Sequence, residues 1–454
     1  MRFLLSLLAV LVVVPVAGAQ APAPIAPRAK SGGSTTVRML GHLPLDGYFG
    51  NGGVDIEQEL SRPYVYISGM NDKAGFTVVS LKDPSSPVIA YQYRFPMTPL
   101  DQGLGGENGR YFKLRNRYYY AKTVQFGARG PDAPPGNDSL GLQVFDVTGL
   151  PDPATVKQVA HIGAVGARVT HVFPYKHSDG RLLLLTTPAI GPFAQIYDAA
   201  KLLSSGAPAA LLGQVPVPAE VNLKTVTRGY HDTYAAYDPN TRQDKLYGAG
   251  TGGFHVFDIT KPEEPKFLFS MSGGGGVIAG GHTVIASPDG KYAVGTTERQ
   301  FWPVFVWDLA PGIAGVSKQI SAPAGAWTAD WQDGSHIVEM RWPYVFVASF
   351  EDGLQIFNIS NPKQPKTEGW YYTCMCEHQT GWSGSVTRPG TTIMNGAADI
   401  DIRNADGLIV MTDYTSGLWA FRFEGFNGWN GKYWRMPNSS SEQDWDRGPL
   451  NPVP

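Results

Sequence analysis

Hydrophobic and polar positions follow a repeated pattern that is clearest over residues 336–366, "HIVEMRWPYVFVASFEDGLQIFNISNPKQPK". An apolar segment is followed by a turn, a β-branched and aromatic segment (YVFVAS), a short Gly loop and an alternating segment (LQIFNIS). A fourth segment, TEGWYY, comes after an Asn/Pro turn. Alternation with a period of two, bounded by Gly, Pro and Asn, is typical of β-strands. The unit therefore predicts a four-stranded β-sheet.

The same pattern recurs along the chain. Further copies begin near Tyr64, Tyr118, Leu182, Lys245, Lys291 and Leu408, which makes seven with the copy above. Self-similarity at ~40–50 residues indicates a β-propeller with four-stranded blades. The last copy lacks a fourth strand, and an additional strand, VRMLGHLPL, precedes the first copy at 37–45. We therefore predict an all-β, seven-bladed β-propeller over 37–425, in which the N-terminal strand completes the last blade and closes the ring.

The two ends of the chain differ from this pattern. Residues 1–19 combine one Arg, an apolar run and "AGA", which predicts a secretory signal peptide cleaved after Ala19. A Pro/Ala/Gly-rich, disordered lead-in is expected over 20–36, and a C-terminal tail that packs partly on the propeller over 426–454. No later segment has the ~20 apolar residues that a membrane span needs. We expect an exported protein, periplasmic or extracellular, without a membrane span.

Composition excludes several classes of function. The chain has 37 Lys and Arg against 39 Asp and Glu, without a basic cluster, so a nucleic-acid partner is not expected. It holds only two cysteines, so a hydrophobic core and not disulfides must stabilise the fold. The usual motifs of serine esterases, zinc proteases, P-loop proteins and c-type cytochromes are absent from the sequence. The expected partner is a small-molecule substrate or surface ligand at the loop face of a monomer.

The ends of the third strands carry a family resemblance. "GLQIFNISNPKQPK", "FHVFDITKPEEPK" and "GLQVFDVTGLPDP" resemble the LVIVD-repeat family of secreted bacterial and archaeal propellers. The resemblance covers nearly all of the chain after the leader, and it implies a fold and an exported location. It implies no chemistry, because that family is largely uncharacterised in function.

Four histidines begin the innermost strands of four consecutive blades: His171, His231, His282 and His336. Each lies 22 to 27 residues before the Asp or Asn that ends the third strand of its blade. The chain has nine histidines in 454 residues, so four at matching positions exceed random placement. Inner strands surround the propeller axis, so the four imidazoles are predicted to converge in the channel. The opposite arc is left to Asp55, Asp399 and Arg110.

Two interpretations of this histidine ring are open. Neutral imidazoles bind Fe, Cu or Zn, and an open site on the axis predicts a metal-dependent oxidoreductase, with Fe or Cu favoured over Zn. The ring resembles the iron site of carotenoid oxygenases and, more loosely, the copper centre of selenium-binding/methanethiol oxidase propellers, although the wider motifs of neither are present. Alternatively, the histidines are structural and hydrogen-bonded within the channel of a non-catalytic binding propeller, with no cofactor.

Carboxylates near the ring could orient metal-bound histidines. The candidates are Asp232, Glu298, Glu339, Glu351 and Asp413, together with Asp55 and Asp399. A Gly-rich connection between the sixth and seventh blades adds Cys374, Cys376 and His378, which could bind a soft metal or cover the site. The two cysteines could equally form a strained disulfide or remain buried thiols.

Overall fold

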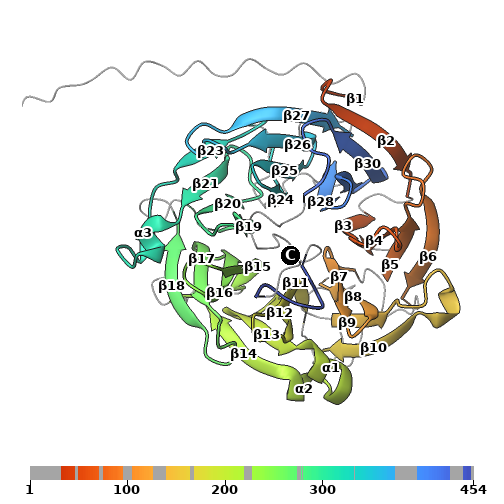
Figure 1. Cartoon of the computed structure of the whole chain (residues 1–454), viewed down its shortest axis with the longest axis horizontal. Helices are drawn as coiled ribbons and strands as arrows, with labels where there is room; N and C mark the ends of the chain where they lie inside the picture. Colours follow the sequence, from red (N-terminus) through yellow and green to blue (C-terminus); the bar gives the residue numbers. More distant parts are fainter. Residues whose placement is uncertain are drawn as a thin grey trace, which may run out of the picture.

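A computed structural model describes the chain over 32–45, 50–70, 75–95, 105–125, 140–163, 168–218, 228–272, 278, 280–331, 333–373, 396–429 and 443–450. Seven β-sheets are arranged around a central axis, with the inner strands on the axis and the outer strands at the rim (Figure 1). Each sheet has four antiparallel strands of a blade, and two sheets carry one short additional strand. The predicted seven-bladed propeller is confirmed.

The blades follow one another in chain order. Blade 1 consists of β3 (Asn51–Ile56), β4 (Tyr64–Gly69), β5 (Gly75–Ser80) and β6 (Val88–Arg94). Blade 2 consists of β7 (Gly109–Leu114), β8 (Arg117–Val124), β9 (Gly141–Asp146) and β10 (Lys157–Ile162). Blade 3 consists of β11 (Val169–Lys176), β12 (Leu182–Pro188), β13 (Phe193–Asp198) and β14 (Leu211–Pro216). Blade 4 consists of β15 (Tyr230–Asp238), β16 (Gln243–Gly250), β17 (Gly253–Asp258) and β18 (Lys266–Met271), extended by β22 (Gln319–Ile320).

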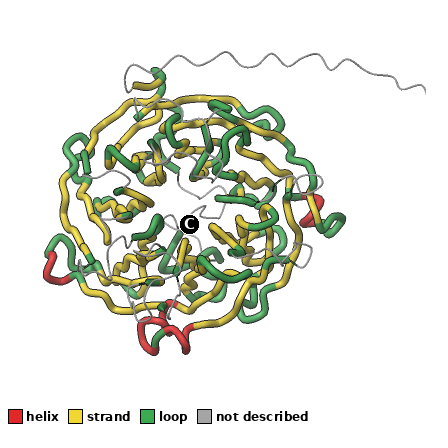
Figure 2. The backbone as a smooth tube through the Cα atoms, turned by 180° about the vertical axis from the view of Figure 1, so that it is seen from behind, coloured by secondary structure: helices red, strands yellow, loops and turns green. Residues whose placement is uncertain are grey.

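The remaining blades have the same plan. Blade 5 consists of β19 (Thr283–Ala286), β20 (Tyr292–Thr296), β21 (Val304–Asp308) and β23 (Gly325–Trp327). Blade 6 consists of β24 (Ile337–Arg341), β25 (Tyr344–Ser349), β26 (Gly353–Asn358) and β27 (Lys366–Tyr372), extended by β1 (Gly32–Gly33). Blade 7 consists of β28 (Ala397–Arg403), β29 (Leu408–Asp413), β30 (Gly417–Phe423) and β2 (Val37–Leu43). Short helices lie between strands at the rim: α1 (Ala199–Ser205), α2 (Ala207–Ala210), α3 (Ala310–Ile313) and a 3-10 turn (Pro153–Thr155) (Figure 2).

The ring closes through the N-terminal strand, as predicted. β2 pairs antiparallel with β30, from Val37 opposite Phe423 to Leu43 opposite Leu418. The His42 ring stacks on Trp419 with ring centroids 3.8 Å apart. Residues just before this strand, which the sequence assigned to the lead-in, also belong to the fold, because β1 pairs with the outer strand of blade 6. No helix among the described residues is long and apolar enough to cross a membrane.

Blades are joined to one another at the point where each inner strand begins. Hydroxyl groups near the end of a second strand donate hydrogen bonds to backbone carbonyls at the start of the next inner strand. The pairs are Ser68 to Gly106 (2.5 Å), Thr187 to His231 (3.0 Å), Thr296 to His336 (2.8 Å) and Thr412 to Gly52 (2.5 Å). These buried bonds fix the backbone that carries the channel residues.

The C-terminal segment 443–450 lies near β7 and β11, across the end of the channel at which the inner strands finish (Figure 1). Gln443 accepts a hydrogen bond from the backbone N–H of Lys176 and donates one to the carbonyl of Pro174. Trp445 is buried, and Asp446 lies 3.0 Å from Lys113 Nζ. Since Lys176 and Lys113 lie at the far ends of their inner strands, the segment covers the channel end opposite the histidines.

Loss of the closing strand should destabilise the whole ring. A chain starting at Pro44 lacks β2 and exposes the edge of β30, with the buried Val37 side chain and the strand ladder lost. We expect the free energy of unfolding to fall by about 5 kcal/mol or more, seen as a lower Tm in calorimetry. A chain starting at Gly32 keeps β1 and β2 and should unfold like the mature protein. Equal Tm values for the two truncations would contradict closure by β2.

Candidate metal centre

His231, His282 and His336 occupy equivalent positions in blades 4, 5 and 6. In each blade, the residue after the histidine pairs with the second strand at an equivalent position, which is Ala249, Thr296 or Ala348. Each of these three residues lies four positions after the residue that pairs with the Asp or Asn at the end of the third strand. The blade repeat therefore brings the three rings to one level of the channel, as the sequence pattern indicated.

His171 is displaced from this level by one residue. It pairs directly with Thr187, the equivalent point of blade 3, so its structural counterpart in blade 4 is Asp232 and not His231. His171 Nε2 lies 2.8 Å from Asp232 Oδ1. In blade 2, Glu107 occupies the position equivalent to the three histidines. The next residue, Asn108, accepts a backbone hydrogen bond from Thr123, which is the equivalent position in the second strand of this blade.

The three equivalent histidines form a continuous row. Ring centroids of His231 and His282 are 3.9 Å apart, and those of His282 and His336 are 4.5 Å apart. The row ends on the Phe350 ring, which stacks on His336 at 4.8 Å. Three imidazoles in contact cannot all be protonated without strong repulsion.

The protonation state differs along the row. Burial lowers the pKa of His231 and of His282 well below the ordinary value, and neighbouring positive charges lower it further. Burial would also lower the pKa of His336, but the carboxylates of Glu107 and Glu298 outweigh this effect and raise it to about 9. His231 and His282 are thus neutral, and His336 is an imidazolium.

Glu107 is the counter-ion of His336. His336 Nε2 lies 3.0 Å from Glu107 Oε1, and the Tyr414 hydroxyl donates a hydrogen bond of 2.7 Å to the same oxygen. Burial would raise the pKa of Glu107, but the His336 charge outweighs burial and lowers it to about 2. His336 Nδ1 contacts the carbonyl of Ala398 in blade 7. Nε2 of His336 is therefore engaged in an ion pair, although it makes no hydrogen bond, and Nδ1 contacts a backbone carbonyl.

His231, His282 and Glu298 can hold a metal ion together. One ligand atom from each lies within 4.8 Å of the others, and no second such group occurs in the described part of the chain. His282 Nδ1 is 3.1 Å from the Thr283 hydroxyl, while its Nε2, 3.3 Å from Glu298 Oε2, makes no hydrogen bond; nor does the buried His231 Nδ1. Burial raises the pKa of Glu298 to about 7. Two buried nitrogens without hydrogen bonds beside a carboxylate are the arrangement that a cation would satisfy.

The loop that carries Glu298 is strained. Glu298 and Phe301 both have left-handed backbone conformations, with φ values of 62° and 63°. Non-glycine residues in this region cost free energy and are concentrated at functional sites. The strain turns Glu298 toward the histidines, while Phe301 remains 65% exposed.

The predicted site residues therefore separate into three groups. His231, His282 and Glu298 come together, and His171 with Asp232 and His336 with Glu107 form two neighbouring pairs. Glu351 lies instead beside the buried Asp333, whose pKa it helps to raise, and Asp413 holds the turn after β29 by accepting hydrogen bonds from Thr415 and Ser416. Cys374, Cys376 and His378 lie outside the described residues.

The opposite arc of the channel belongs to a layer of buried ionisable groups deeper than the histidines. Its members are Asp55, Arg110, Glu339 and Asp401, which pair with Tyr66, Ala121, Phe346 and Val410 of their second strands, and Phe173, Tyr234 and Ile285 complete the ring. Arg110 Nη1 lies 3.2 Å from Asp399 Oδ2, and Arg341 Nη1 lies 3.1 Å from Glu339 Oε2. Asp55 and Asp399 also accept backbone hydrogen bonds from Tyr111 and Val54 in the next blades. Asp55, Arg110 and Asp399 thus hold blades together, while Glu339 pairs with Arg341 within its own strand, and none of the four belongs to the three-residue site.

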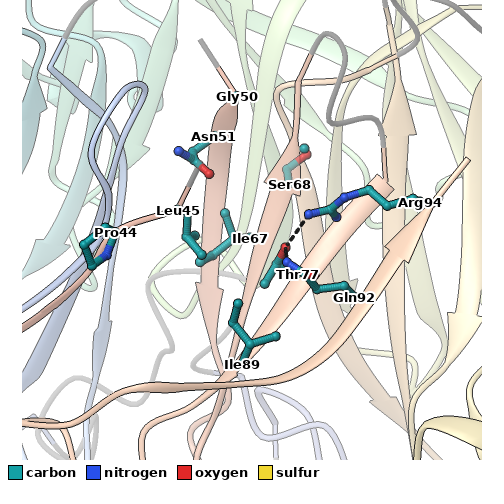
Figure 3. A pocket seen from close by; sticks show the side chains of 11 residues that line it. Pro44, Leu45, Gly50, Asn51, Ile67, Ser68, Thr77, Ile89, Gln92 and Arg94 are labelled. Atoms are coloured by element: carbon teal, nitrogen blue, oxygen red, sulfur yellow. Dashed lines mark hydrogen bonds between the residues drawn. The ribbon is translucent and has the colours of Figure 1, made fainter. Parts of the chain in front are cut away.

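A separate pocket of about 260 Å³ lies beside the inner half of blade 1 (Figure 3). Its cation, Arg94, donates hydrogen bonds to the carbonyls of Phe76 and Tyr93 and to the Thr77 hydroxyl. No residue of the histidine row lines this pocket. It is therefore distinct from the candidate metal centre.

Sequence reasoning missed two residues of the site, Glu107 and Arg228. Glu107 stands three residues before Arg110, which was taken as the counterpart of the histidines in blade 2, and correct strand register would have found it. Arg228 stands three residues before His231, and only its electrostatic effect on His231, His282 and Glu298 connects it with the site. No sequence pattern indicated that role.

Comparisons with known proteins support the fold and add no chemistry. Residues 343–373 match the LVIVD repeat, which confirms the resemblance found in the sequence. No curated protein matches the chain. Similar solved structures include the WD40 β-propeller domain of Doa1 (TM-score 0.51, 10% identity, 86% of this chain and 97% of that chain covered). The C-terminal WD40 domain of Sif2 is similar to the same degree (TM-score 0.51, 8% identity, 85% and 98% covered). At these identities the likeness shows the fold alone.

The buried ion layer predicts a pH-dependent effect of one substitution. Burial, together with the charge of Asp401, raises the pKa of Asp55 well above 3.8. Its contribution to stability is therefore present below the unfolded value and is lost as pH rises through the folded value. Asp55→Asn, which retains an oxygen for the Tyr111 N–H, should gain in Tm relative to wild type as the pH is raised from about 5 to about 8. The exposed Asp83→Asn variant should show no such gain, and an equal difference for Asp55→Asn at both pH values would contradict the assignment.

Proposed function

We propose that this propeller is an exported, metal-dependent oxidoreductase that binds one transition-metal ion through His231, His282 and Glu298. The observation that carries the proposal is the convergence of three ligand atoms within 4.8 Å, two of them on neutral imidazoles with buried nitrogens that make no hydrogen bond. Neutral imidazole is the form that binds metals. His231 is only partly buried, as a ligand of an ion exchanged with solvent would be.

The ligand set favours iron. Two histidines and one carboxylate with open positions are typical of non-haem Fe(II) sites, whereas a site of imidazoles alone would suit copper better. Zinc also accepts two histidines and a glutamate, so the ligand types do not by themselves exclude it. A bound ion of this kind supplies a redox centre or a Lewis acid.

The neighbouring pairs have defined roles in the proposed site. The His336 imidazolium, held by Glu107, lies with Nε2 3.9 Å from Glu298 Oε1 and orients that carboxylate. Contact with the His336 ring also fixes the plane of His282. His171 and Asp232 lie beside the row as an ion pair, with 2.8 Å between Nε2 and the carboxylate, and are outside the three-residue group. Such outer partners position metal ligands and tune their basicity.

A non-catalytic binding propeller is the second candidate. It is favoured by the carboxylate partners of His171 and His336, which show that histidines of this ring can serve without a metal. The LVIVD repeat itself points to no reaction. Metal content separates the two candidates directly.

The first prediction concerns bound metal. Mature protein from the exported route, purified without a tag and reconstituted with Fe(II) under reducing conditions, should hold about one iron per chain by mass spectrometry. The double variant His231→Ala/His282→Ala should hold less than about a tenth of that, and the Co(II)-substituted form should lose its d–d absorption. His161→Ala, in the outer strand of blade 2, is the matched control and should bind like wild type. Wild-type iron content in the double variant would overturn the proposed site.

The second prediction concerns redox activity. Fe(II)-loaded wild type, desalted and supplied with ascorbate as reductant, should consume dioxygen faster than the double variant treated identically, in a polarographic assay. His161→Ala should retain the wild-type rate. If bound iron is confirmed but dioxygen uptake equals that of the double variant, the metal is structural and the oxidoreductase assignment fails.

A further inference from the structure

The pocket of about 260 Å³ in blade 1 lies where that blade meets blade 7 (Figure 3). Leu45, which lines it, comes two residues after β2, the strand that completes blade 7. The rest of the floor is buried and includes Asn51, Ile67 and Thr77, whereas the exposed rim carries Ile89, Gln92 and Arg94. Closure of the ring therefore brings polar and apolar side chains together in one hollow.

Alternation along the outer strand β6 sets which side chains reach the pocket. Gln92 pairs with Thr77 of β5, and Arg94 follows two residues later on the same face of the sheet. Tyr93 between them lies on the other face, where its ring centroid is 5.7 Å from that of Phe76. The period of the strand thus fixes both polar rim residues on the pocket side.

Arg94 is held in place by neutral acceptors alone. Its Nη1 donates hydrogen bonds of 3.3 and 3.0 Å to the carbonyls of Phe76 and Tyr93, and its Nη2 donates one of 3.3 Å to the Thr77 hydroxyl. None of the described residues that line the pocket is acidic. Burial lowers the pKa of Arg94, and no carboxylate of the described residues offsets this effect. Three of five N–H donors are used, so Nε–H and one N–H of Nη2 remain for a ligand.

Two further polar groups face the same hollow. The Thr77 hydroxyl accepts hydrogen bonds from Arg94 and from Gln92 Nε2, at 3.3 and 3.4 Å, and its own O–H donates to no described residue. The Asn51 amide nitrogen donates to the carbonyl of Asp413 at 3.4 Å, which leaves the amide oxygen as an acceptor (Figure 3). The pocket therefore offers donors at one end and an acceptor at the other.

The remaining wall is aliphatic. Leu45 and Ile67 are buried, but Ile89 is 46% exposed although it lines the pocket, so a ligand with an apolar part would cover it. No aromatic side chain is among the described lining residues, and stacking of a ring or a sugar face is therefore not indicated. The volume lies near the lower end of small-molecule sites, which favours a small ligand.

We propose that this pocket binds a small aliphatic carboxylate, with the carboxylate on Arg94 and Thr77 and the alkyl chain against Leu45, Ile67 and Ile89. A guanidinium matches a carboxylate with two parallel hydrogen bonds. A phosphate is less well suited, because no lysine and no helix N-terminus stands beside Arg94 among the lining residues. This second site goes beyond the proposed metal centre, since the pocket shares no residue with the three-residue group.

The experiment compares a carboxylate with its neutral isostere. Pentanoate, pentanamide and inorganic phosphate are titrated by calorimetry into metal-free protein at low ionic strength. Wild type should bind pentanoate about tenfold or more tighter than pentanamide, which corresponds to about 1.4 kcal/mol. In Arg94→Gln the two should bind alike with an unchanged Tm, because Arg94 is exposed. Lys82→Gln removes an exposed cation of the same blade and is the matched control, which should keep the preference.

Two more variants locate the ligand. The double variant His231→Ala/His282→Ala should keep the pentanoate preference, whereas Ile89→Ser should weaken pentanoate about fourfold through lost apolar contact. Equal binding of pentanoate and pentanamide, a preference that survives in Arg94→Gln, or tighter binding of phosphate than of pentanoate overturns the inference. Loss of the preference in the double variant overturns it as well, because the carboxylate then binds at the histidines. None of these results bears on bound iron, so the metal proposal is tested separately.

Discussion

Backbone hydrogen bonds between β2 and β30 join the beginning of the propeller to its end, and every other feature depends on that closure. A ring of blades has no free edge between its first and last members, whereas an open row of the same sheets would expose two. Closure also sets the angle between neighbouring blades and therefore the distances across the channel. The contact between His231 and His282 exists because blades 4 and 5 meet at an angle that closes the ring.

The channel has two chemically different halves at its middle level. Asp55, Arg110, Glu339 and Asp401 come from blades 1, 2, 6 and 7, while Phe173, Tyr234 and Ile285 come from the three blades between. Buried charges are tolerable only when they pair. Arg110 pairs with Asp399, Glu339 and Asp401 lie beside Arg341, and Asp55 accepts a hydrogen bond from a backbone N–H of the next blade. The histidine row lies above this layer, and the C-terminal segment covers the opposite end.

Charge is distributed unequally over the proposed site. His336 and Glu107 form an ion pair, and the His336 charge, in addition to burial, helps to lower the pKa of His282 and His231, which keeps these two imidazoles neutral. Glu298 lies between His282 and His336, 3.3 Å from Nε2 of the first and 3.9 Å from Nε2 of the second. Burial raises its pKa to about 7, so a bound cation would favour its carboxylate form.

The sequence by itself determined the number of blades, their strand pattern, the closing strand and the presence of histidines at inner-strand starts. These follow from local periodicity, since alternation and turn residues act over a few positions. It placed His231, His282 and His336 at one level of the channel but aligned His171 with them one residue out of register. The hairpins of blade 3 are one residue longer than those of blade 4, 27 positions from His171 to Asp198 against 26 from Asp232 to Asp258, so equal spacing in sequence did not mean equal position. Asp399 and Arg110 were likewise assigned to the arc opposite the histidines, where they lie, but as inter-blade links and not as ligands. Only the tertiary structure decided that Glu298 joins two histidines and that Glu107 takes the fourth position. Those facts depend on angles between blades and on a strained loop, and both arise from contacts between residues far apart in the chain.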